Sequence, residues 1–153
     1  MKSTKNKDCI FCKIGSGEIP SAKVWEDKNH LAILDINPNT DGMTLVLTKE
    51  HFGSDATDMP DKPYQELMIA AKRVAKLLEK KLKVKRVAIV MEGLGVNHVH
   101  IKLYPIRGLD EKFKEIWAKE KIFFKEYRGY ISTQLGPQKT AEELNKIAKI
   151  IKS

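Results

Sequence analysis

A run of alternating polar and apolar residues at positions 97–105, Asn-His-Val-His-Ile-Lys-Leu-Tyr-Pro, constrains this chain more than any other feature. Such alternation is typical of a strand that buries one face and leaves the other free for chemistry. The apolar face carries Val99, Ile101 and Leu103. The polar face carries His98, His100, Lys102 and Tyr104. Neighbours on that face lie roughly 6.5–7 Å apart, so two histidines and a lysine share one surface.

A short turn with two glycines, Glu-Gly-Leu-Gly-Val at positions 92–96, precedes this run. Glycine allows the backbone to approach a ligand closely and to adopt positive φ without steric cost. Backbone amides that point toward a row of cationic or nucleophilic side chains suit an anion, and phosphate is the anion we expect. The alternative is a solvated strand face with an incidental histidine pair, because isolated motifs often match by chance.

The length of 153 residues suits one domain with a proper core, and 42% hydrophobic and 31% charged residues are ordinary for a soluble globular protein. No apolar run approaches the roughly 20 residues that cross a bilayer. Residues 1–8 are polar and lack the apolar segment of a signal peptide, so the cytoplasm is the expected compartment and membrane association is not expected.

The formal net charge of +8 allows nucleotides, nucleic acids and acidic membrane surfaces as partners. The lysines are dispersed along the chain, however, and runs such as residues 79–83 suit the C-terminal end of a helix. We interpret most of this charge as solvated surface, which makes a nucleotide a better candidate than nucleic acid.

The two cysteines, Cys9 and Cys12, are separated by two residues. This spacing provides half of a zinc site, and His51 and His98 are the natural candidates for the other half. Thiolate and imidazole ligands together favour zinc over metals that prefer oxygen. Two alternatives remain, namely a pair of buried free cysteines and a redox-active pair, although the βαβ context of the latter is missing.

Periodicity predicts strands at 23–26, 30–36, 43–48 and 86–91, and a long helix from near Pro63 to Leu82 with Asp61 as its N-cap. Strands joined by short turns and followed by helices indicate an α+β antiparallel fold. We expect a flexible tail at 1–8 and a single domain at 9–153. Its C-terminal extension, 106–153, should hold a helix at 109–121, an edge strand at 128–133 and a last helix.

The last helix should begin with a capping box formed by Thr140 and Glu143. Its helical spacing predicts that Leu144, Ile147 and Ile151 form a buried face.

Five motifs in order make the chain resemble the histidine triad (HIT) family. They are Cys-Ile-Phe-Cys-Lys-Ile, Gly-Glu-Ile-Pro-Ser-Ala-Lys-Val-Trp-Glu-Asp, Leu-Asp-Ile-Asn-Pro, Lys-Glu-His and His-Val-His-Ile-Lys. The resemblance covers Cys9 to about Pro105 and fades in the tail. It implies an antiparallel sheet of five or so strands with flanking helices, a homodimer, and attack by a histidine on a nucleotide α-phosphate.

The resemblance also assigns roles by position. It implies that His100 is the nucleophile and that Asp35 holds the ribose hydroxyls. Gly95 of the glycine turn is also expected to bind the nucleotide. By the same comparison the ligands of a structural zinc ion are Cys9, Cys12, His51 and His98. The apolar nucleotide pocket is implied at Ile10, Phe11, Ile14, Ile33 and Ile36. A flat apolar slot for a base and a carboxylate for a diol agree with this assignment.

The chain departs from the family pattern at four positions. Lys102 replaces the third histidine, Met43 replaces the histidine after the loop glycine, Met91 replaces an asparagine, and Gly95 stands where a hydroxyl is common. A cation at 102 keeps a neighbouring imidazole neutral and offsets charge on the phosphoryl oxygens. A lysine with an ordinary pKa near 10.4 donates protons poorly, which favours good leaving groups such as pyrophosphate or a second nucleotide.

The leading hypothesis is therefore a nucleotide hydrolase or nucleotidyl transferase that uses His100 and Lys102 and forms a covalent nucleotidyl-histidine on a nucleoside polyphosphate. The first alternative is a nucleotide-binding module without turnover, in which Lys102 is a drifted position. The second is a zinc-stabilised protein associated with nucleic acid, for which the net charge of +8 is the single argument.

Overall fold

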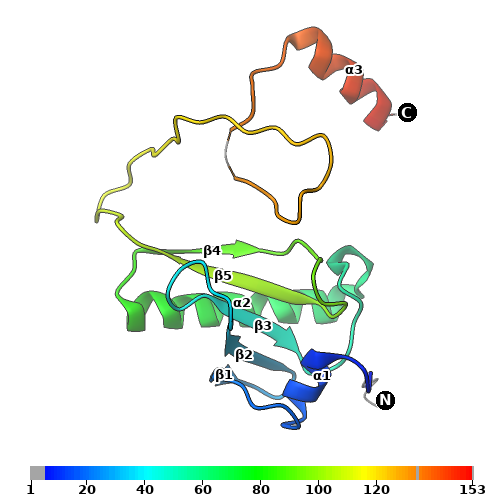
Figure 1. The fold of residues 1–153 in the computed structure, drawn as a ribbon, viewed down its shortest axis with the longest axis vertical. Coiled ribbons are helices and arrows are strands. Elements are labelled where there is room, and N and C mark those ends of the chain that lie inside the picture. Colours follow the sequence, from blue (N-terminus) through cyan, green and yellow to red (C-terminus); the bar gives the residue numbers. More distant parts are fainter. Residues whose placement is uncertain (1–5, 134, 153) are drawn as a thin grey trace. The chain divides into compact units, whose positions relative to one another are not determined.

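A computed structural model describes residues 6–133 and 135–152 of the chain (Figure 1). Residues 1–5 of the predicted tail lie outside the described residues. The chain divides into two compact units, residues 1–112 and 113–153. The first unit holds the sheet and the candidate site.

The first unit is built on one five-stranded sheet in which every neighbouring pair of strands is antiparallel (Figure 1). Its strands are β1 (Lys23–Glu26), β2 (His30–Leu34), β3 (Thr44–Thr48), β4 (Arg86–Val90) and β5 (His100–Ile106), in the order β1-β2-β3-β5-β4. The helices of this unit are α1 (Ile10–Gly15), the 3-10 turn η1 (Ala56–Asp58) and α2 (Asp61–Leu82). The predicted α+β fold with a five-stranded antiparallel sheet and flanking helices is confirmed.

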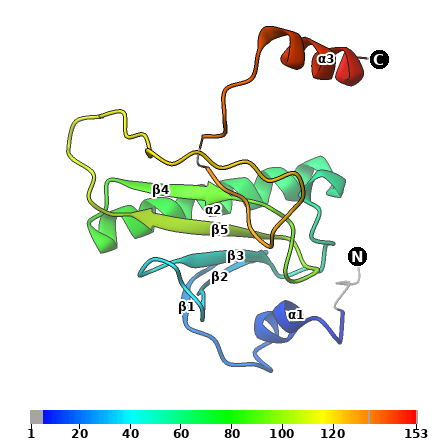
Figure 2. The same ribbon diagram turned by 45° about the horizontal axis from the view of Figure 1, so that its top comes forward.

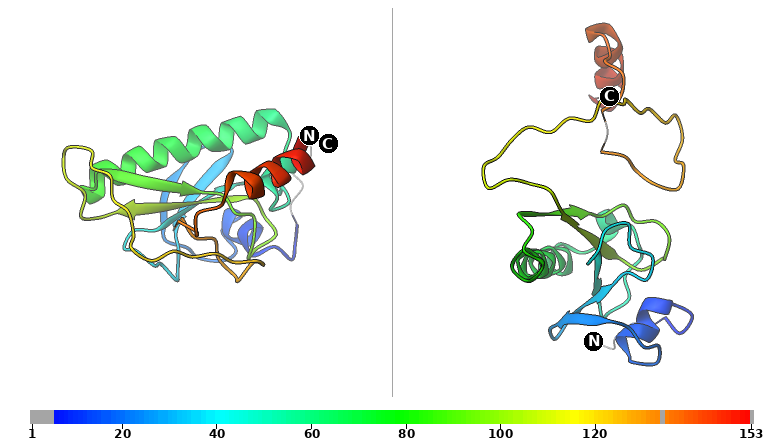
Figure 3. Two further views of the ribbon diagram at one scale, coloured as in Figure 1. Left: turned by 90° about the horizontal axis from the view of Figure 1, so that it is seen from above. Right: turned by 60° about the vertical axis from the view of Figure 1, so that its left-hand side comes forward.

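The long helix α2 covers one face of the sheet and runs along β4 and β5 (Figures 2 and 3). Its buried residues recur at helical spacing and include Leu67, Val74 and Leu78. They belong to one apolar cluster with Ile101 and Leu103 of β5. The helix ends where Lys83 adopts the left-handed conformation, with φ of 53°.

The predicted N-cap of α2 was wrong by one residue. Pro60 is the N-cap, and Asp61 is the first helical residue. A carboxylate in the first turn still favours the positive end of the helix dipole, which explains why the acidic residue marked the start of the helix so closely.

The opposite face of the sheet carries α1 and a second apolar cluster. Phe11 and both cysteines pack there against strand residues that include Ile33 and Leu45. The register places Leu47 opposite His100 and Leu45 opposite Lys102, so these two β5 side chains lie on the face of α1. The predicted alternation of the histidine segment is confirmed, although β5 begins at His100 and the segment 97–99 is outside the strand.

The predictions for the C-terminal extension, residues 106–153, were mostly wrong. Residues 109–121 form no helix and residues 128–133 form no strand, and the structure describes all of these residues. The helix α3 (Ala141–Lys152) is confirmed with its capping box, because Thr140 N donates to Glu143 Oε2 at 2.8 Å and Glu143 N donates to Thr140 Oγ1 at 3.2 Å. Its predicted buried face is exposed at Leu144, Ile147 and Ile151. Periodicity identifies an apolar side of a helix but supplies no surface to cover it.

Two apolar residues of α2 provide a test of the core. Leu67 is fully buried, whereas Ile69 is 50% exposed. We expect Leu67→Ala to lower the free energy of unfolding by about 2–5 kcal/mol, because it leaves a cavity between the helix and the sheet. Ile69→Ala is the matched control and should change stability by about 0.5 kcal/mol or less. Urea denaturation of both variants measures the difference, and equal losses would contradict this packing.

Candidate functional site

Four residues that are distant in sequence bring their ligand atoms within 4.8 Å of one another at one end of the sheet. Cys9 precedes α1, Cys12 lies within it, His51 follows β3, and His98 precedes β5. Nδ1 of His98 lies 3.4 Å from Cys9 Sγ and 3.6 Å from Cys12 Sγ. Nδ1 of His51 lies 3.4 Å from Cys12 Sγ and 3.3 Å from Nδ1 of His98. The structure thus brings together the four predicted metal ligands, which can hold one metal ion.

The surroundings of His98 suit a metal ligand. Its Nε2 lies 2.9 Å from the carbonyl oxygen of Thr48, which can only accept, so Nε2 carries the proton and Nδ1 keeps a lone pair directed at the thiols. Burial lowers the pKa of His98 to about 4, so its imidazole is neutral at physiological pH. With the two cysteine sulfurs and His51, this neutral ring supplies the fourth donor of a four-coordinate site.

His100 is held with one nitrogen ready for chemistry. Its Nδ1 donates to the carbonyl oxygen of His98 at 2.8 Å, which leaves the lone pair on Nε2. The ring is buried, and the edge of Phe11 packs against it with ring centroids 5.4 Å apart. The pKa of His100 is lowered, and burial of the ring is the largest cause. The charge of Lys102 lowers this pKa further. Neutral imidazole with a free Nε2 can act as a nucleophile or a base.

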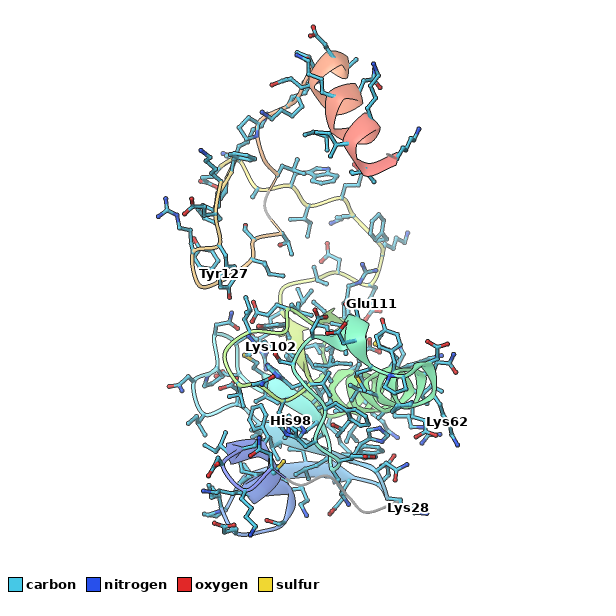
Figure 4. The ribbon with its side chains drawn as sticks, turned by 90° about the vertical axis from the view of Figure 1, so that its right-hand side faces the viewer. Lys28, Lys62, His98, Lys102, Glu111 and Tyr127 are labelled. Atoms are coloured by element: carbon cyan, nitrogen blue, oxygen red, sulfur yellow. The ribbon has the colours of Figure 1, made fainter. Side chains whose placement is uncertain are left out.

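Lys102 follows His100 on the same face of β5 and forms an ion pair with Glu92 (Figure 4 labels Lys102 and His98). The side chain of Glu92 is 10% exposed and that of Lys102 is 22% exposed. Sequence reasoning missed Glu92, which it treated as part of a turn. No local sequence pattern signals this pairing, because it depends on the register that places Val90, two residues before Glu92, opposite Lys102.

The predicted nucleotide-binding residues divide into two groups. Phe11 and Ile33 are buried in the second apolar cluster, and Ile14 packs against it, on the sheet face that carries His100. Ile10 is exposed, and Ile36 is 91% exposed because β2 ends at Leu34 rather than at the predicted residue 36. The structure therefore does not bring Ile10 and Ile36 into the packed cluster.

Asp35 follows β2 and ends it with a local turn. Its backbone N–H donates to Met43 O at 3.0 Å, and its Oδ1 accepts from Asn37 N at 2.8 Å. Its charge acts on both His100 and Tyr104, so it lies near the polar face of β5. Gly95 adopts φ of 91° and no atom lies within 4 Å of the position of a Cβ there, so the glycine turn is open at this point.

An antiparallel sheet with a His-x-His segment beside a cluster of two cysteines and two histidines defines a protein of the histidine triad class. The family model described as "HIT domain" matches residues 16–108, which is more than half of the chain. The chain belongs to the HIT family, which confirms the resemblance at the level of the family.

Known proteins that resemble this chain in sequence or in fold agree with this family assignment. The chain is 40% identical over 116 residues to adenosine 5'-monophosphoramidase HNT1 of Saccharomyces cerevisiae, covering 72% of this chain and 68% of that protein. The fold resembles the crystal structure of SMU.412c from Streptococcus mutans, with a TM-score of 0.71, 31% identity and coverage of 99% of this chain and 87% of that one. It also resembles a zinc-bound histidine triad family protein from Mycobacterium smegmatis, with a TM-score of 0.61, 34% identity and coverage of 68% and 78%.

A search for membrane spans covered the described residues. None of the helices there combines the length and the apolar character that a bilayer crossing requires.

Proposed function

We propose that this protein is a nucleotide hydrolase or nucleotidyl transferase that acts at the α-phosphate of a nucleoside polyphosphate or a related nucleotide. The observation that carries the proposal is the hydrogen bond of 2.8 Å from His100 Nδ1 to the carbonyl of His98, which leaves the Nε2 lone pair available for attack. Membership of the HIT family and the 40% identity to an adenosine 5'-monophosphoramidase support a nucleotide substrate.

The proposed reaction has two steps. In the first, Nε2 of His100 attacks the α-phosphorus, the bond from phosphorus to the leaving group breaks, and the leaving group departs with the electron pair. In the second, water or another acceptor attacks the nucleotidyl-histidine. The P–N bond then breaks, its electrons return to Nε2, and the proton of the attacking water is released.

Lys102 provides the positive charge of this reaction. Its ammonium group offsets the negative charge that develops on the phosphoryl oxygens. An ammonium group with three N–H donors can contact a carboxylate and a phosphate at the same time, so its ion pair with Glu92 is compatible with this role. Because lysine donates a proton poorly at neutral pH, the best substrates should have leaving groups that depart without protonation, such as pyrophosphate or a second nucleotide.

The nucleoside would lie beside the second apolar cluster. We propose that Phe11, Ile14 and Ile33 form the wall for the base, that the exposed Ile10 and Ile36 cover it from the solvent side, and that Asp35 accepts from the ribose hydroxyls. Gly95 leaves space for the phosphate in the glycine turn. Exposed apolar residues beside an acidic side chain suit a ligand that is flat at one end and polar at the other.

We propose zinc as the metal of the cysteine and histidine cluster, in a structural role. Two thiolates and two imidazoles are the donors that zinc prefers, and four protein ligands close its coordination shell. The zinc-bound relative from Mycobacterium smegmatis supports this assignment. The zinc-stabilised nucleic-acid-associated alternative has no observation in its favour beyond the net charge of +8.

A second candidate function is nucleotide binding without turnover. The replacement of a triad histidine by Lys102 favours it, because an imidazole with a pKa near neutrality is lost from the site. Turnover on a panel of dinucleoside polyphosphates and nucleoside phosphoramidates, followed by chromatography, decides between the two. Products from any substrate support the enzyme, and none from the whole panel supports the binding module.

We expect His100→Ala to abolish turnover while nucleotide binding persists, because the variant loses the attacking nitrogen and keeps the pocket. Lys102→Ala should slow turnover by about 10²–10³-fold through loss of one charge contact in the transition state. Mass spectrometry of rapidly quenched, denatured protein should show a nucleotidyl adduct on His100. If His100→Ala turns over substrate as fast as the unaltered protein, the mechanism is wrong.

We expect Asp35→Ala to weaken AMP binding by about 1–3 kcal/mol, because the ribose hydroxyls lose their acceptor. Calorimetry with AMP measures the change. Asp41→Ala, at another acidic residue in the loop that follows β2, is the control and should leave the affinity unchanged. Equal affinities for the unaltered protein and Asp35→Ala would remove Asp35 from the site.

Removal of zinc should lower the melting temperature more than it lowers the rate of turnover, because the metal cross-links segments that are distant in sequence. We expect about one zinc ion per chain in protein purified without added metal. Metal analysis and thermal melting with and without a chelator test this, and re-addition of zinc should restore the melting temperature. Less than half an equivalent of zinc with unchanged melting after chelation would count against the site.

A further inference from the structure

The ion pair between Lys102 and Glu92 joins the polar face of β5 to the glycine turn. Lys102 lies between Leu45 of β3 and Val90 of β4 in the sheet register. Glu92 is two residues beyond Val90, at the start of the turn, and reaches back to the Lys102 ammonium. His100, Lys102 and Tyr104 alternate along β5 and so share one face, and the ion pair therefore lies on the same face as the proposed chemistry.

The turn that carries Glu92 is fixed against a neighbouring loop. Gly93 has φ of 73°, and a Cβ at this position would lie 2.9 Å from the carbonyl oxygen of Ser54. Asn97 closes the other end of the turn, because its Oδ1 accepts from Ser54 N at 3.0 Å. The turn thus lies directly against the loop at Ser54 near both of its ends, and Glu92 is the residue that precedes this close approach.

The ion pair between Lys102 and Glu92 is more buried than an ion pair on the protein surface. The side chains of Lys102 and Glu92 are 22% and 10% exposed, whereas Lys76 and Glu79 of α2 pair at 2.5 Å with side chains 70% and 24% exposed. Withdrawing two charges from water costs free energy that their attraction often does not recover. A pair in this position is therefore a weak device for stability, and a role in the site is the better explanation.

A lysine in place of an imidazole has to be held in position, because its charged group lies at the end of a flexible chain. The lysine side chain has four flexible torsions and loses more conformational freedom than most side chains when it is ordered. Electrostatic stabilisation of a transition state requires a charge that is already in place before the reaction. A carboxylate on the neighbouring turn meets this need, because it holds the ammonium group in place, and an ammonium group can contact a carboxylate and a phosphoryl oxygen at the same time.

We propose that Glu92 is a positioning residue, which orders the Lys102 ammonium for the phosphoryl group bound at His100, so that Glu92 and Lys102 together replace the missing third histidine. This inference rests on the proposed function. Glu92 itself does not contact the reacting atoms, and its effect passes through Lys102.

A double-mutant cycle tests the inference. We compare the unaltered protein with Glu92→Gln, Lys102→Met and the double variant, and measure kcat and KM on the substrate of the panel that is turned over. Glu92→Gln should lower kcat on the order of ten-fold and leave KM nearly unchanged, since the ordered ammonium acts in the transition state. In the Lys102→Met background, Glu92→Gln should cause no further loss.

Two further variants separate positioning from folding. Glu92→Asp keeps the carboxylate and should recover part of the lost kcat. Glu79→Gln breaks the exposed pair on α2 and should leave kcat unchanged. Melting temperatures and zinc content of all variants show whether the site remains folded. Equal losses of kcat from Glu92→Gln in both backgrounds, or no loss in either, would overturn the inference while the proposed function stands.

A failure of the proposed function can be told apart from a failure of this inference. In that case the unaltered protein turns over no substrate of the panel and forms no adduct on His100. The same cycle is then measured as affinity for AMP. Weaker AMP binding by Glu92→Gln when Lys102 is present, but not in the Lys102→Met background, would support positioning at a binding site. Unchanged AMP affinity across the cycle would overturn it.

Discussion

The strand β5 lies between β3 and β4, and its alternating side chains enter two different environments. Ile101 and Leu103 pack beneath α2, and this burial fixes the register of the strand, because a slip of one residue would place them on the opposite face. The same register then places His100 and Lys102 on the face of α1. The hydrophobic effect on one side of the sheet therefore determines where the candidate site lies on the other side.

The cysteine and histidine cluster adds a second constraint at the beginning of β5. His98 is bonded through Nε2 to Thr48 of β3, while its Nδ1 faces the cysteines of α1. Its carbonyl oxygen accepts from His100 Nδ1. One residue thus connects the candidate metal site to the candidate nucleophile, and a metal ion in the cluster would hold the backbone that orients His100. In the proposed function, this connection would let a structural metal ion affect catalysis through the orientation of His100.

Much of the first unit was predictable because its pattern is local. Alternation at 97–105 predicted the two faces of β5, and the spacing of Cys9 and Cys12 predicted one half of the cluster. Glu92 was not predictable, since its pairing depends on the register of β4 with β5 and on the fixed turn at Gly93. The expected helix at 109–121 was wrong because apolar spacing is necessary for an amphipathic helix but does not ensure a surface that stabilises it.

In the proposed function, a lysine at position 102 in place of an imidazole would change the proton chemistry of the site as well as its charge. An imidazole can donate a proton at neutral pH, whereas an ammonium group of ordinary pKa donates one poorly there. Such a group attracts phosphoryl oxygens without protonating a leaving group. In the proposed function, the ion pair with Glu92 would therefore preserve the electrostatic role of the third histidine without its acid chemistry, which matches leaving groups that need no proton.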